Sequence, residues 1–497
     1  AMKYLVKYSP EMTTKSRIVR TRFCKQLRKN VARILRERLG IADQAAKPGA
    51  ADVALVQAHW DYLEVALSPA HQDATAELEE ILGHTPGIWS FQRVEERPLG
   101  SFEELADLTV SLYAPLVRGK SFVVRCKRAG KHAFKSMDVE RYLGGALLRQ
   151  GEARKVDLHN PEVTVYLEIR HDQVFVGAAP QDGIGGFPLG TQDSVVSLIS
   201  GGFDSAVATY LAMKRGMRTH FLFFNLGGRE HELAVKEVAL YLWQRYGASH
   251  GVHFISVPFE AVVAEILESV ENSQMGVVLK RMMLRAATEV GQRLQVEALV
   301  TGESIAQVSS QTLVNLAVID EVTPKLVLRP LIMSDKQDIV DLARRIGTAE
   351  FSAVIPEYCG VISVKPTTRA RRHRIEREEQ RFDFTVLERA VAQAEMLNIR
   401  TLSLESPQDA PVPQEHDTLA AGVTVIDIRH PDEEERKPLA LAQGEVLKVP
   451  FYRLSTVFTT LDPQQTYLLY CSKGVMSRLH AAHLLEQGNS NVGVYRP

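Results

Sequence analysis

Residues 195–205 read VVSLISGGFDS, and this stretch decides the fold of the segment around it. An apolar run typical of a buried strand stops at Ser200, two glycines follow, and Asp204 and Ser205 begin a pattern typical of a helix. A strand that enters a glycine-rich turn and leaves on a helix directs backbone N–H groups and the helix dipole at one point. The stretch therefore predicts an anion site, although two glycines alone also fit a tight turn.

The residues around this loop, from 195 to about 350, alternate apolar strands with helical patterns. The strand-like runs are VVSLIS, THFLFFNLG, HFISVPF and ALVTGE. Such alternation predicts a doubly wound, mostly parallel sheet that binds its ligand at the carboxyl ends of the strands.

The chain has 497 residues, which is too long for one ordinary core and predicts several domains. Its 45% hydrophobic and 24% charged residues are typical of a globular protein. No run of about 18 apolar residues occurs, and the first ten residues lack the apolar core of a signal peptide, so we expect a cytoplasmic protein without membrane contact. The four cysteines, at positions 24, 126, 359 and 471, show no CxxC spacing, and we predict no metal site.

Positive charge is concentrated in the N-terminal part, although the net charge of the chain is −1. Residues 1–40 hold twelve Lys or Arg and two acids, and residues 115–135 hold seven basic residues and no acid. This asymmetry allows an RNA partner, and a solvated amphipathic helix explains the first run equally well. The candidate RNA contacts are Arg125, Lys127, Arg128 and Lys131.

The local patterns of the N-terminal part alternate strands and helices. A strand at 3–9, a long amphipathic helix at 15–40 and a strand at 63–68 predict a ferredoxin-like domain over residues 1–71. A second unit has a helix at 101–119, whose N-cap Ser101 precedes Glu104 by three residues, and a basic strand that begins at 121.

A third kind of pattern follows the proline-rich segment at 396–418, which we predict to be a linker. In LLYCSKGVMSRLHAAHLL (468–485) a strand ends at Tyr470, Cys471 opens a loop and a helix begins near Ser477. Backbone N–H groups at such a helix N-terminus stabilise a thiolate or a persulfide. A buried structural cysteine is the competing interpretation.

The sequence SGGFDS after an apolar strand resembles the PP-loop of the ATP pyrophosphatases, which adenylate a substrate and release pyrophosphate. The resemblance implies that Asp204 helps organise metal-bound triphosphate and that Lys336, at the head of a helix, offsets the charge of the leaving pyrophosphate. The residues implied in ATP binding are Leu198, Ile199, Ser200, Gly201, Gly202, Ser205, Lys280, Gly302 and Gln311.

Two further stretches fit this site. KRMMLRAA (280–287) supplies Arg281 beside Lys280 as a second cation. In VTGESIAQVSSQTLVNL (300–316) we expect a strand, a turn at Gly302, and then Gln307 and Gln311 at helical spacing.

The C-terminal loop, with VIDIR (425–429) on an earlier strand, resembles a rhodanese domain, and FVVRCKRAGKHAF with DVERYLGG resembles a THUMP domain. The combination resembles the ThiI family of tRNA 4-thiouridine synthetases, in its long form, over essentially the whole chain. The domains that this resemblance implies are ferredoxin-like (1–71), THUMP (72–176), PP-loop (177–395), linker (396–418) and rhodanese (419–497).

The resemblance also implies a reaction. ATP, with Mg²⁺, is a substrate that adenylates O4 of uridine 8 in tRNA, and no organic cofactor is bound. A cysteine desulfurase loads Cys471 with a persulfide, Cys359 then forms a disulfide with Cys471, and a cellular thiol reductant resets the pair. Asp427 and Arg429 would support the loop of Cys471, and the THUMP domain would hold the acceptor end of tRNA.

Two other functions remain open. The first is a rhodanese-type sulfur carrier for the thiazole of thiamine, which would pass sulfur to a sulfur-carrier protein without ATP or RNA. The second is a small-molecule ATP pyrophosphatase of the amidating type, which is disfavoured because no glutaminase-like domain is evident.

Overall fold

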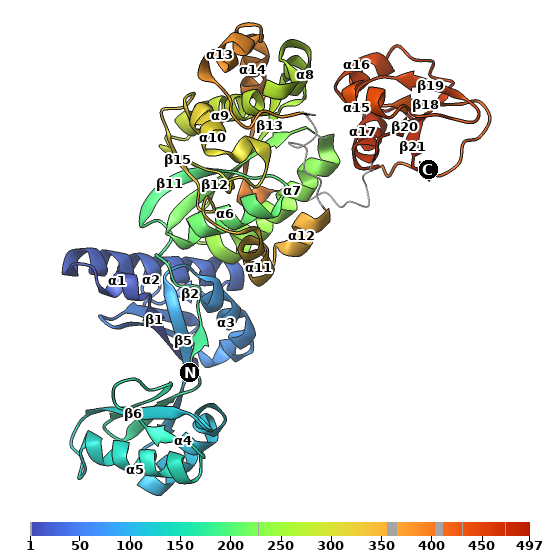
Figure 1. Cartoon of the computed structure of the whole chain (residues 1–497). Helices are drawn as coiled ribbons and strands as arrows, with labels where there is room; N and C mark the ends of the chain where they lie inside the picture. Colours follow the sequence, from blue (N-terminus) through green and yellow to red (C-terminus); the bar gives the residue numbers. More distant parts are fainter. Residues whose placement is uncertain (1, 227, 355–364, 403–410, 430, 473) are drawn as a thin grey trace. The chain divides into compact units, whose positions relative to one another are not determined.

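The computed structural model describes residues 2–226, 228–354, 365–402, 411–429, 431–472 and 474–497. The chain divides into two compact units. Figure 1 shows their helices and strands, coloured along the sequence. One unit consists of residues 1–191 with 214–216, and the other of residues 192–213 with 217–497. Both units combine helices with sheets, which confirms the prediction of a multidomain α+β and α/β protein.

The first half of the N-terminal unit repeats the order strand, helix, strand twice. Its elements are β1 (Met2–Tyr8), α1 (Pro10–Thr13), α2 (Arg17–Leu39), β2 (Ala42–Asp43), β3 (Val53–Ala58), β4 (Tyr62–Leu67), a 3-10 helix (Pro69–Ala74), α3 (Thr75–His84) and β5 (Ile88–Pro98). The helix α2 ends at Gly40, whose φ of 68° is in the left-handed region that glycine adopts readily. The strand order β3-β4-β1-β5 is that of a ferredoxin-like sheet, and it needs α3 and β5, which follow residue 71.

The second half of this unit continues the same sheet. Its elements are α4 (Phe102–Val117), β6 (Ser121–Ala129), α5 (Ser136–Arg149), β7 (Lys155–Val156), β8 (Val163–Arg170), β9 (Gln173–Gly177) and β10 (Gln181–Asp182). Ser101 caps α4 as predicted, since its hydroxyl accepts the backbone N–H of Glu104 at 3.2 Å. The helices α4 and α5 cover β6 and β8 around a core that includes Tyr113 and Phe122.

The strand β5 joins the two halves. Lys3–Tyr8 of β1 pair with the stretch from Ile88 to Val94, and the stretch from Val94 to Pro98 pairs with β9. The resulting sheet has ten strands, in the order β2-β3-β4-β1-β5-β9-β8-β6-β7, with β10 paired to β5. The sequence patterns did not predict β5.

The second unit begins with a six-stranded sheet. Its strands are β11 (Gln192–Leu198), β12 (Met217–Asn225), β13 (His253–Pro258), β14 (Ala298–Val300), β15 (Leu326–Leu328) and β16 (Glu395–Asn398). Their order is β15-β14-β11-β12-β13-β16, and only β16 runs antiparallel to its neighbour. The chain leaves β11 toward β12 on one side and later returns to β14 on the other, so the carboxyl end of β11 is the topological switch point where such sheets bind ligands.

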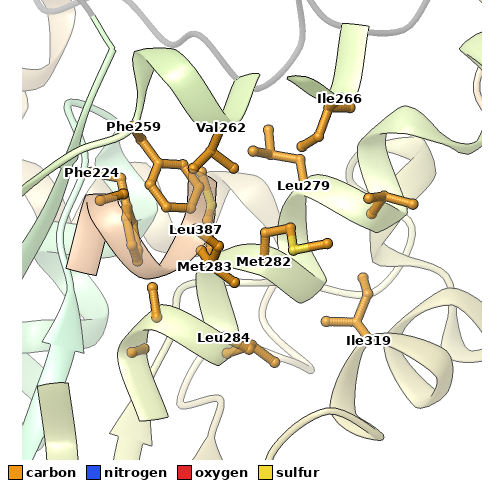
Figure 2. Packing of buried hydrophobic residues seen from close by; sticks show 14 of the residues in the cluster. Phe224, Phe259, Val262, Ile266, Leu279, Met282, Met283, Leu284, Ile319 and Leu387 are labelled. Atoms are coloured by element: carbon orange, nitrogen blue, oxygen red, sulfur yellow. The ribbon is translucent and has the colours of Figure 1, made fainter. Parts of the chain in front are cut away.

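Helices connect and cover these strands. They are α6 (Phe203–Lys214), α7 (Gly228–Leu242), a π-helix (Trp243–Gly247), α8 (Glu260–Ser269), a 3-10 helix (Asn272–Gln274), α9 (Met275–Arg293), a 3-10 helix (Ser309–Gln311), α10 (Leu313–Asp320), α11 (Lys336–Ile346), α12 (Ala349–Val354), α13 (Arg372–Gln380), α14 (Phe384–Ala392) and a 3-10 helix (Ile399–Thr401). Figure 2 shows part of the core, where Phe259 and Val262 from the start of α8 pack near Met282 and Met283 of α9 and Leu387 of α14.

The C-terminal part is a small α/β domain with its own sheet. Its elements are β17 (Glu415–His416), β18 (Val423–Asp427), α15 (Pro431–Arg436), β19 (Glu445–Lys448), a 3-10 helix (Phe451–Arg453), α16 (Leu454–Phe458), β20 (Thr466–Tyr470), α17 (Val475–Glu486) and β21 (Val492–Tyr495). All five strands are parallel, in the order β17-β21-β20-β18-β19. The segment predicted as a linker is paired near both ends, through β16 and β17.

None of the helices in the described part of the chain is both long and apolar enough to cross a membrane.

Candidate functional site

The glycine-rich loop lies at the carboxyl end of β11, and its own hydroxyl groups hold its shape. The Oγ atom of Ser205 accepts the backbone N–H of Ser200 at 3.0 Å, and the Oγ atom of Ser200 lies 3.3 Å from the backbone nitrogen of Gly202, which donates to it. The helix α6 begins at Phe203, directly after the loop. The strand, turn and helix predicted from VVSLISGGFDS are therefore present, and the positive end of α6 points at the loop.

Asp204, in the first turn of α6, is the centre of the polar contacts at this loop. One carboxylate oxygen, Oδ1, lies 3.1 Å from Nζ of Lys336, the first residue of α11. The other oxygen, Oδ2, accepts a hydrogen bond of 2.8 Å from the side-chain amide of Gln307. Three segments distant in sequence thus meet at one carboxylate.

The segment after β14 approaches the loop very closely at Gly302. A Cβ atom at Gly302 would lie 2.9 Å from the backbone carbonyl carbon of Asp204 and 2.9 Å from the backbone nitrogen of Ser205. Only a residue without a side chain fits this contact. Gly302 was predicted to bind ATP, and this contact gives it a packing role.

Hydrogen bonds tie the segment after β14 to the segment after β15. The backbone N–H of Ile305 donates to the carbonyl oxygen of Ile332 at 3.0 Å, and the hydroxyl group of Ser304 donates to the backbone carbonyl oxygen of Ser334 at 2.8 Å. The side-chain oxygen of Gln311 accepts the N–H of Ser304 at 3.1 Å. Because β14 and β15 are neighbours, these bonds carry Gln307 and Lys336 to the same place.

The helical spacing expected for Gln307 and Gln311 is wrong. Gln307 lies in an irregular segment, Gln311 ends a 3-10 helix of three residues, and α10 begins only at Leu313. The preceding residue, Ala306, has a φ of 61°. Tertiary hydrogen bonds, and not helix propensity, set the conformation of this segment.

A cavity of about 280 Å³ opens beside the loop. Each of the residues predicted to bind ATP lines it, and so does Asp204; the predicted residues are Leu198, Ile199, Ser200, Gly201, Gly202, Ser205, Lys280, Gly302 and Gln311. The cavity has the size of a small-ligand site, and its apolar wall continues into the core through Leu279 and Met283 of α9 (Figure 2).

The expectation that Arg281 is a second cation at this cavity is wrong. Its guanidinium group is buried and donates to Glu379 at 2.8 Å and to the carbonyl oxygen of Val318 at 2.6 Å. Consecutive residues of a helix point about 100° apart, so Lys280 and Arg281 cannot face the same cavity. Arg281 instead pairs a buried acid of α13.

Sequence reasoning missed several lining residues, among them Phe223, Phe224, Leu226 and His231. The signal that could have found the first three is their position at the carboxyl end of β12, the strand next to β11. Burial lowers the pKa of His231 to about 4, so its ring is neutral at neutral pH, and it lies edge-on to Phe223 at 5.0 Å.

A second candidate site lies in the C-terminal domain at Cys471. The residue follows β20, and its thiol is free and buried. Its Sγ atom accepts the backbone N–H of Ser477, in α17, at 3.4 Å. The start of α17 therefore provides a donor to the sulfur, as the loop pattern predicts.

A buried ion pair lies against the end of the strand before Cys471. Arg429 donates to the two carboxylate oxygens of Asp427 at 2.9 and 2.7 Å, and both side chains are buried. The guanidinium group also lies over the ring of Tyr470, 5.1 Å from its centroid. These contacts are consistent with the supporting role expected for the pair. Cys359, the proposed partner of Cys471, lies outside the described residues.

The predicted RNA contacts, by contrast, lie on and after β6 in the N-terminal unit. Arg125, Lys127, Arg128 and Lys131 are all exposed. Cys126 between them is buried, because successive residues of a strand point to opposite faces. The structure thus presents these cations to solvent.

The fold and site together define a nucleotide-binding α/β protein whose loop follows the first strand of the sheet, with a separate domain that carries a free thiol. Residues 190–384 match the family model of the thiamine biosynthesis protein ThiI, and residues 100–178 match that of the THUMP domain. The chain belongs to the ThiI family of tRNA sulfurtransferases.

Relatives with this name match over the full length. The protein is 54% identical over 496 residues to a tRNA sulfurtransferase of Pseudomonas aeruginosa strain LESB58 and 49% identical to one of Yersinia pestis strain Pestoides F, with all of each chain covered. It is also similar to a solved 4-thiouridine synthetase in complex with RNA and bound ATP, with a TM-score of 0.64 and 26% identity over 80% of this chain and 99% of that one.

Proposed function

We propose that the protein is an ATP-dependent tRNA sulfurtransferase that converts uridine 8 of tRNA to 4-thiouridine. The observation that carries this proposal is the convergence of Gln307, Lys336 and the glycine-rich loop on Asp204 beside a cavity of about 280 Å³. The family to which the chain belongs supports it.

ATP would activate an oxygen of the uridine. O4 attacks the α-phosphorus, the bond from that phosphorus to the pyrophosphate oxygen breaks, and an adenylated uridine forms. Lys336 would offset the charge of the departing pyrophosphate, and backbone N–H groups of the loop would bind phosphate oxygens. The activated C4 then carries AMP, which is a good leaving group.

Mg²⁺ would enter with ATP as part of the substrate. In the described part of the chain no three His, Cys, Asp or Glu side chains come together as a metal site. Mg²⁺ is commonly held by one or two carboxylates together with substrate phosphates. The carboxylate of Asp204 at the loop fits this donor set.

Sulfur would reach C4 from Cys471. A cysteine desulfurase transfers sulfane sulfur to the thiol, and the persulfide, or sulfide released from it, adds at C4 and expels AMP. On the bound route the thiolate of Cys359 attacks Sγ of Cys471, which breaks the sulfur–sulfur bond and leaves 4-thiouridine and a Cys359–Cys471 disulfide. A cytoplasmic thiol reductant supplies the two electrons that restore both thiols.

The N-terminal unit would hold the tRNA. The cations Arg125, Lys127, Arg128 and Lys131 are exposed on one strand and the loop after it, where phosphates can reach them. Such contacts position RNA without reading its sequence.

The description of the matching family model, a thiamine biosynthesis protein, favours a second function as a sulfur carrier for thiazole synthesis. That relay needs Cys471 but not ATP. Replacing Cys471 with Ala should therefore abolish both functions, and replacing Asp204 with Ala should impair thiolation alone.

The direct test is to incubate the protein with tRNA, ATP, cysteine and an active cysteine desulfurase and to analyse the nucleosides. We expect 4-thiouridine that depends on ATP. If no 4-thiouridine forms while the desulfurase loads sulfur onto the protein, the main proposal is wrong and the carrier function remains.

A further inference from the structure

Gln307 makes the second hydrogen bond to the carboxylate of Asp204. Its side-chain nitrogen lies 2.8 Å from Oδ2, opposite the oxygen that contacts Lys336. The nitrogen end of the amide must face the carboxylate, because an amide oxygen there would be repelled. The two oxygens of Asp204 are therefore held by two different residues.

Lys336 and Gln307 differ in how easily each can move away from Asp204. Lys336 is half exposed and carries its charge on a long flexible stem, so it can turn toward a triphosphate. Gln307 is held in a segment that is bonded on both sides, since Ile305 donates to Ile332 and Ala306 donates to the carbonyl oxygen of Gln311 at 2.8 Å.

The backbone beside Gln307 is unusual. Ala306 has a φ of 61°, in the left-handed region that residues with a Cβ seldom adopt. Such conformations persist only where surrounding contacts fix them, and they cluster at functional sites. The turn at Ala306 is what directs Gln307 toward the glycine-rich loop.

The oxygen end of the Gln307 amide does not add to the stability of the fold. The Oε1 atom of Gln307 is buried and has no hydrogen-bond partner among the described residues. A buried polar atom without a partner costs free energy. The side chain is therefore placed for the bond to Asp204 and not for its own packing.

From these contacts we propose that Gln307 is a positioning residue for the ATP half of the reaction. It holds the Asp204 carboxylate in the orientation that receives MgATP after Lys336 has turned to the triphosphate. This inference rests on the proposed function, because it needs MgATP as the ligand of the cavity.

The test compares the affinities of the full-length protein for MgATP and for AMP, measured by isothermal titration calorimetry. Gln307→Leu removes the amide and with it the bond, and Gln307→Asn keeps the amide but is one methylene too short to reach. Both variants should weaken MgATP binding by about tenfold, the usual effect of a hydrogen bond to a charged group. AMP, which lacks the triphosphate, should bind within about twofold of wild type.

The control variant is Gln337→Leu. Gln337 donates to Asp341 at the same distance of 2.8 Å, but this exposed pair lies along α11, and Gln337 does not line the cavity. The Gln337→Leu variant should bind MgATP and AMP with the affinities of the wild type. Equal affinity of wild type and both Gln307 variants for MgATP would overturn the inference, and so would an equal loss for MgATP and AMP, since that indicates a collapsed cavity. If wild-type protein does not bind MgATP, the proposed function fails instead.

Discussion

Gly302 and Asp204 touch through their backbones, so that the turn after β14 rests on the first turn of α6. A side chain at Gly302 would place its first carbon 2.9 Å from the carbonyl carbon of Asp204, closer than real Cβ contacts come. The carboxylate of Asp204 can be placed accurately only if this contact is preserved.

Gly302→Ala should therefore impair ATP binding more than stability. The added methyl group meets backbone, which cannot turn aside, so the loop must shift and the rate of thiolation should fall by about 10²-fold, as is usual for a misplacement near 1 Å. Single-turnover thiolation measures this effect. Gly83→Ala in α3 is the control, because its new methyl group meets only Phe91 at ordinary contact distance. Unchanged activity of Gly302→Ala would contradict the role of the contact.

Asp204→Ala should separate the two halves of the reaction. It removes the carboxylate that contacts Lys336 and Gln307, and we expect thiolation to fall by about 10²-fold or more. Loading of Cys471 by the desulfurase, measured by mass spectrometry of the persulfide, should continue. If loading stops as well, the site of Asp204 is not confined to ATP chemistry.

Asp427→Ala should destabilise the C-terminal domain. It leaves the guanidinium group of Arg429 buried without its carboxylate, and such a loss costs about 3–5 kcal/mol. Urea unfolding followed by circular dichroism measures the change. The double variant Asp427→Leu with Arg429→Met should recover much of the loss, because no charge is then left buried. A single variant as stable as wild type would show that the pair does not support the domain.

The free energy of unfolding of the second unit should fall as the pH is lowered, at pH values where carboxylates are still ionised. Burial, followed by the nearby Arg218 and His253, lowers the pKa of His220 to about 4, and its Nδ1 accepts the N–H of His253 at 3.0 Å. In the unfolded chain a histidine has a pKa of about 6.5, so the unfolded state takes up the proton first as the pH falls. The contribution of His220 is complete above pH ~6.5 and is lost between pH ~6.5 and ~4.

The measurement is the free energy of unfolding at intervals from pH 7 to pH 5. In the variant His220→Asn, whose side-chain oxygen can accept the same N–H, the free energy of unfolding should depend less steeply on pH. The exposed His159→Asn should leave this dependence unchanged. An unchanged slope in His220→Asn would rule out this histidine as a source of the acid sensitivity.

Lys131→Ala should weaken tRNA binding and reduce its dependence on salt. Each phosphate contact that is lost lowers the slope of log affinity against log salt by about 0.7–0.9. Filter binding at several salt concentrations measures the slope. Lys437→Ala, an exposed cation of the C-terminal domain, is the control. A parallel loss of affinity at all salt concentrations would mean that Lys131 does not meet a phosphate.

Features with a local cause were predictable from the sequence. The loop 200–205, the Ser101 cap and the helix that begins at Lys336 each depend on a few neighbouring residues, and the structure has all three. The residues that the PP-loop resemblance implied for ATP binding all line the cavity, and the alternation of strands and helices accounts for their meeting at one edge of a parallel sheet.

Features with a distant cause were not predictable. The conformation at Gln307 depends on bonds to the segment after β15, and the inward turn of Arg281 depends on Glu379, which lies 98 residues later. The strand β5 was not predicted because its two ends pair with different strands. Its buried and exposed residues therefore do not alternate regularly. Tertiary contacts decided each of these.

The strand β5 limits how parts of the N-terminal unit can be exchanged between proteins. Its first half completes the sheet of β1, and its second half pairs with β9. A gene fusion that borrowed either half alone would divide a strand and expose a hydrogen-bonding edge, which promotes aggregation. The two halves can therefore be transferred to another protein only together, as a single module, even though each resembles an independent domain.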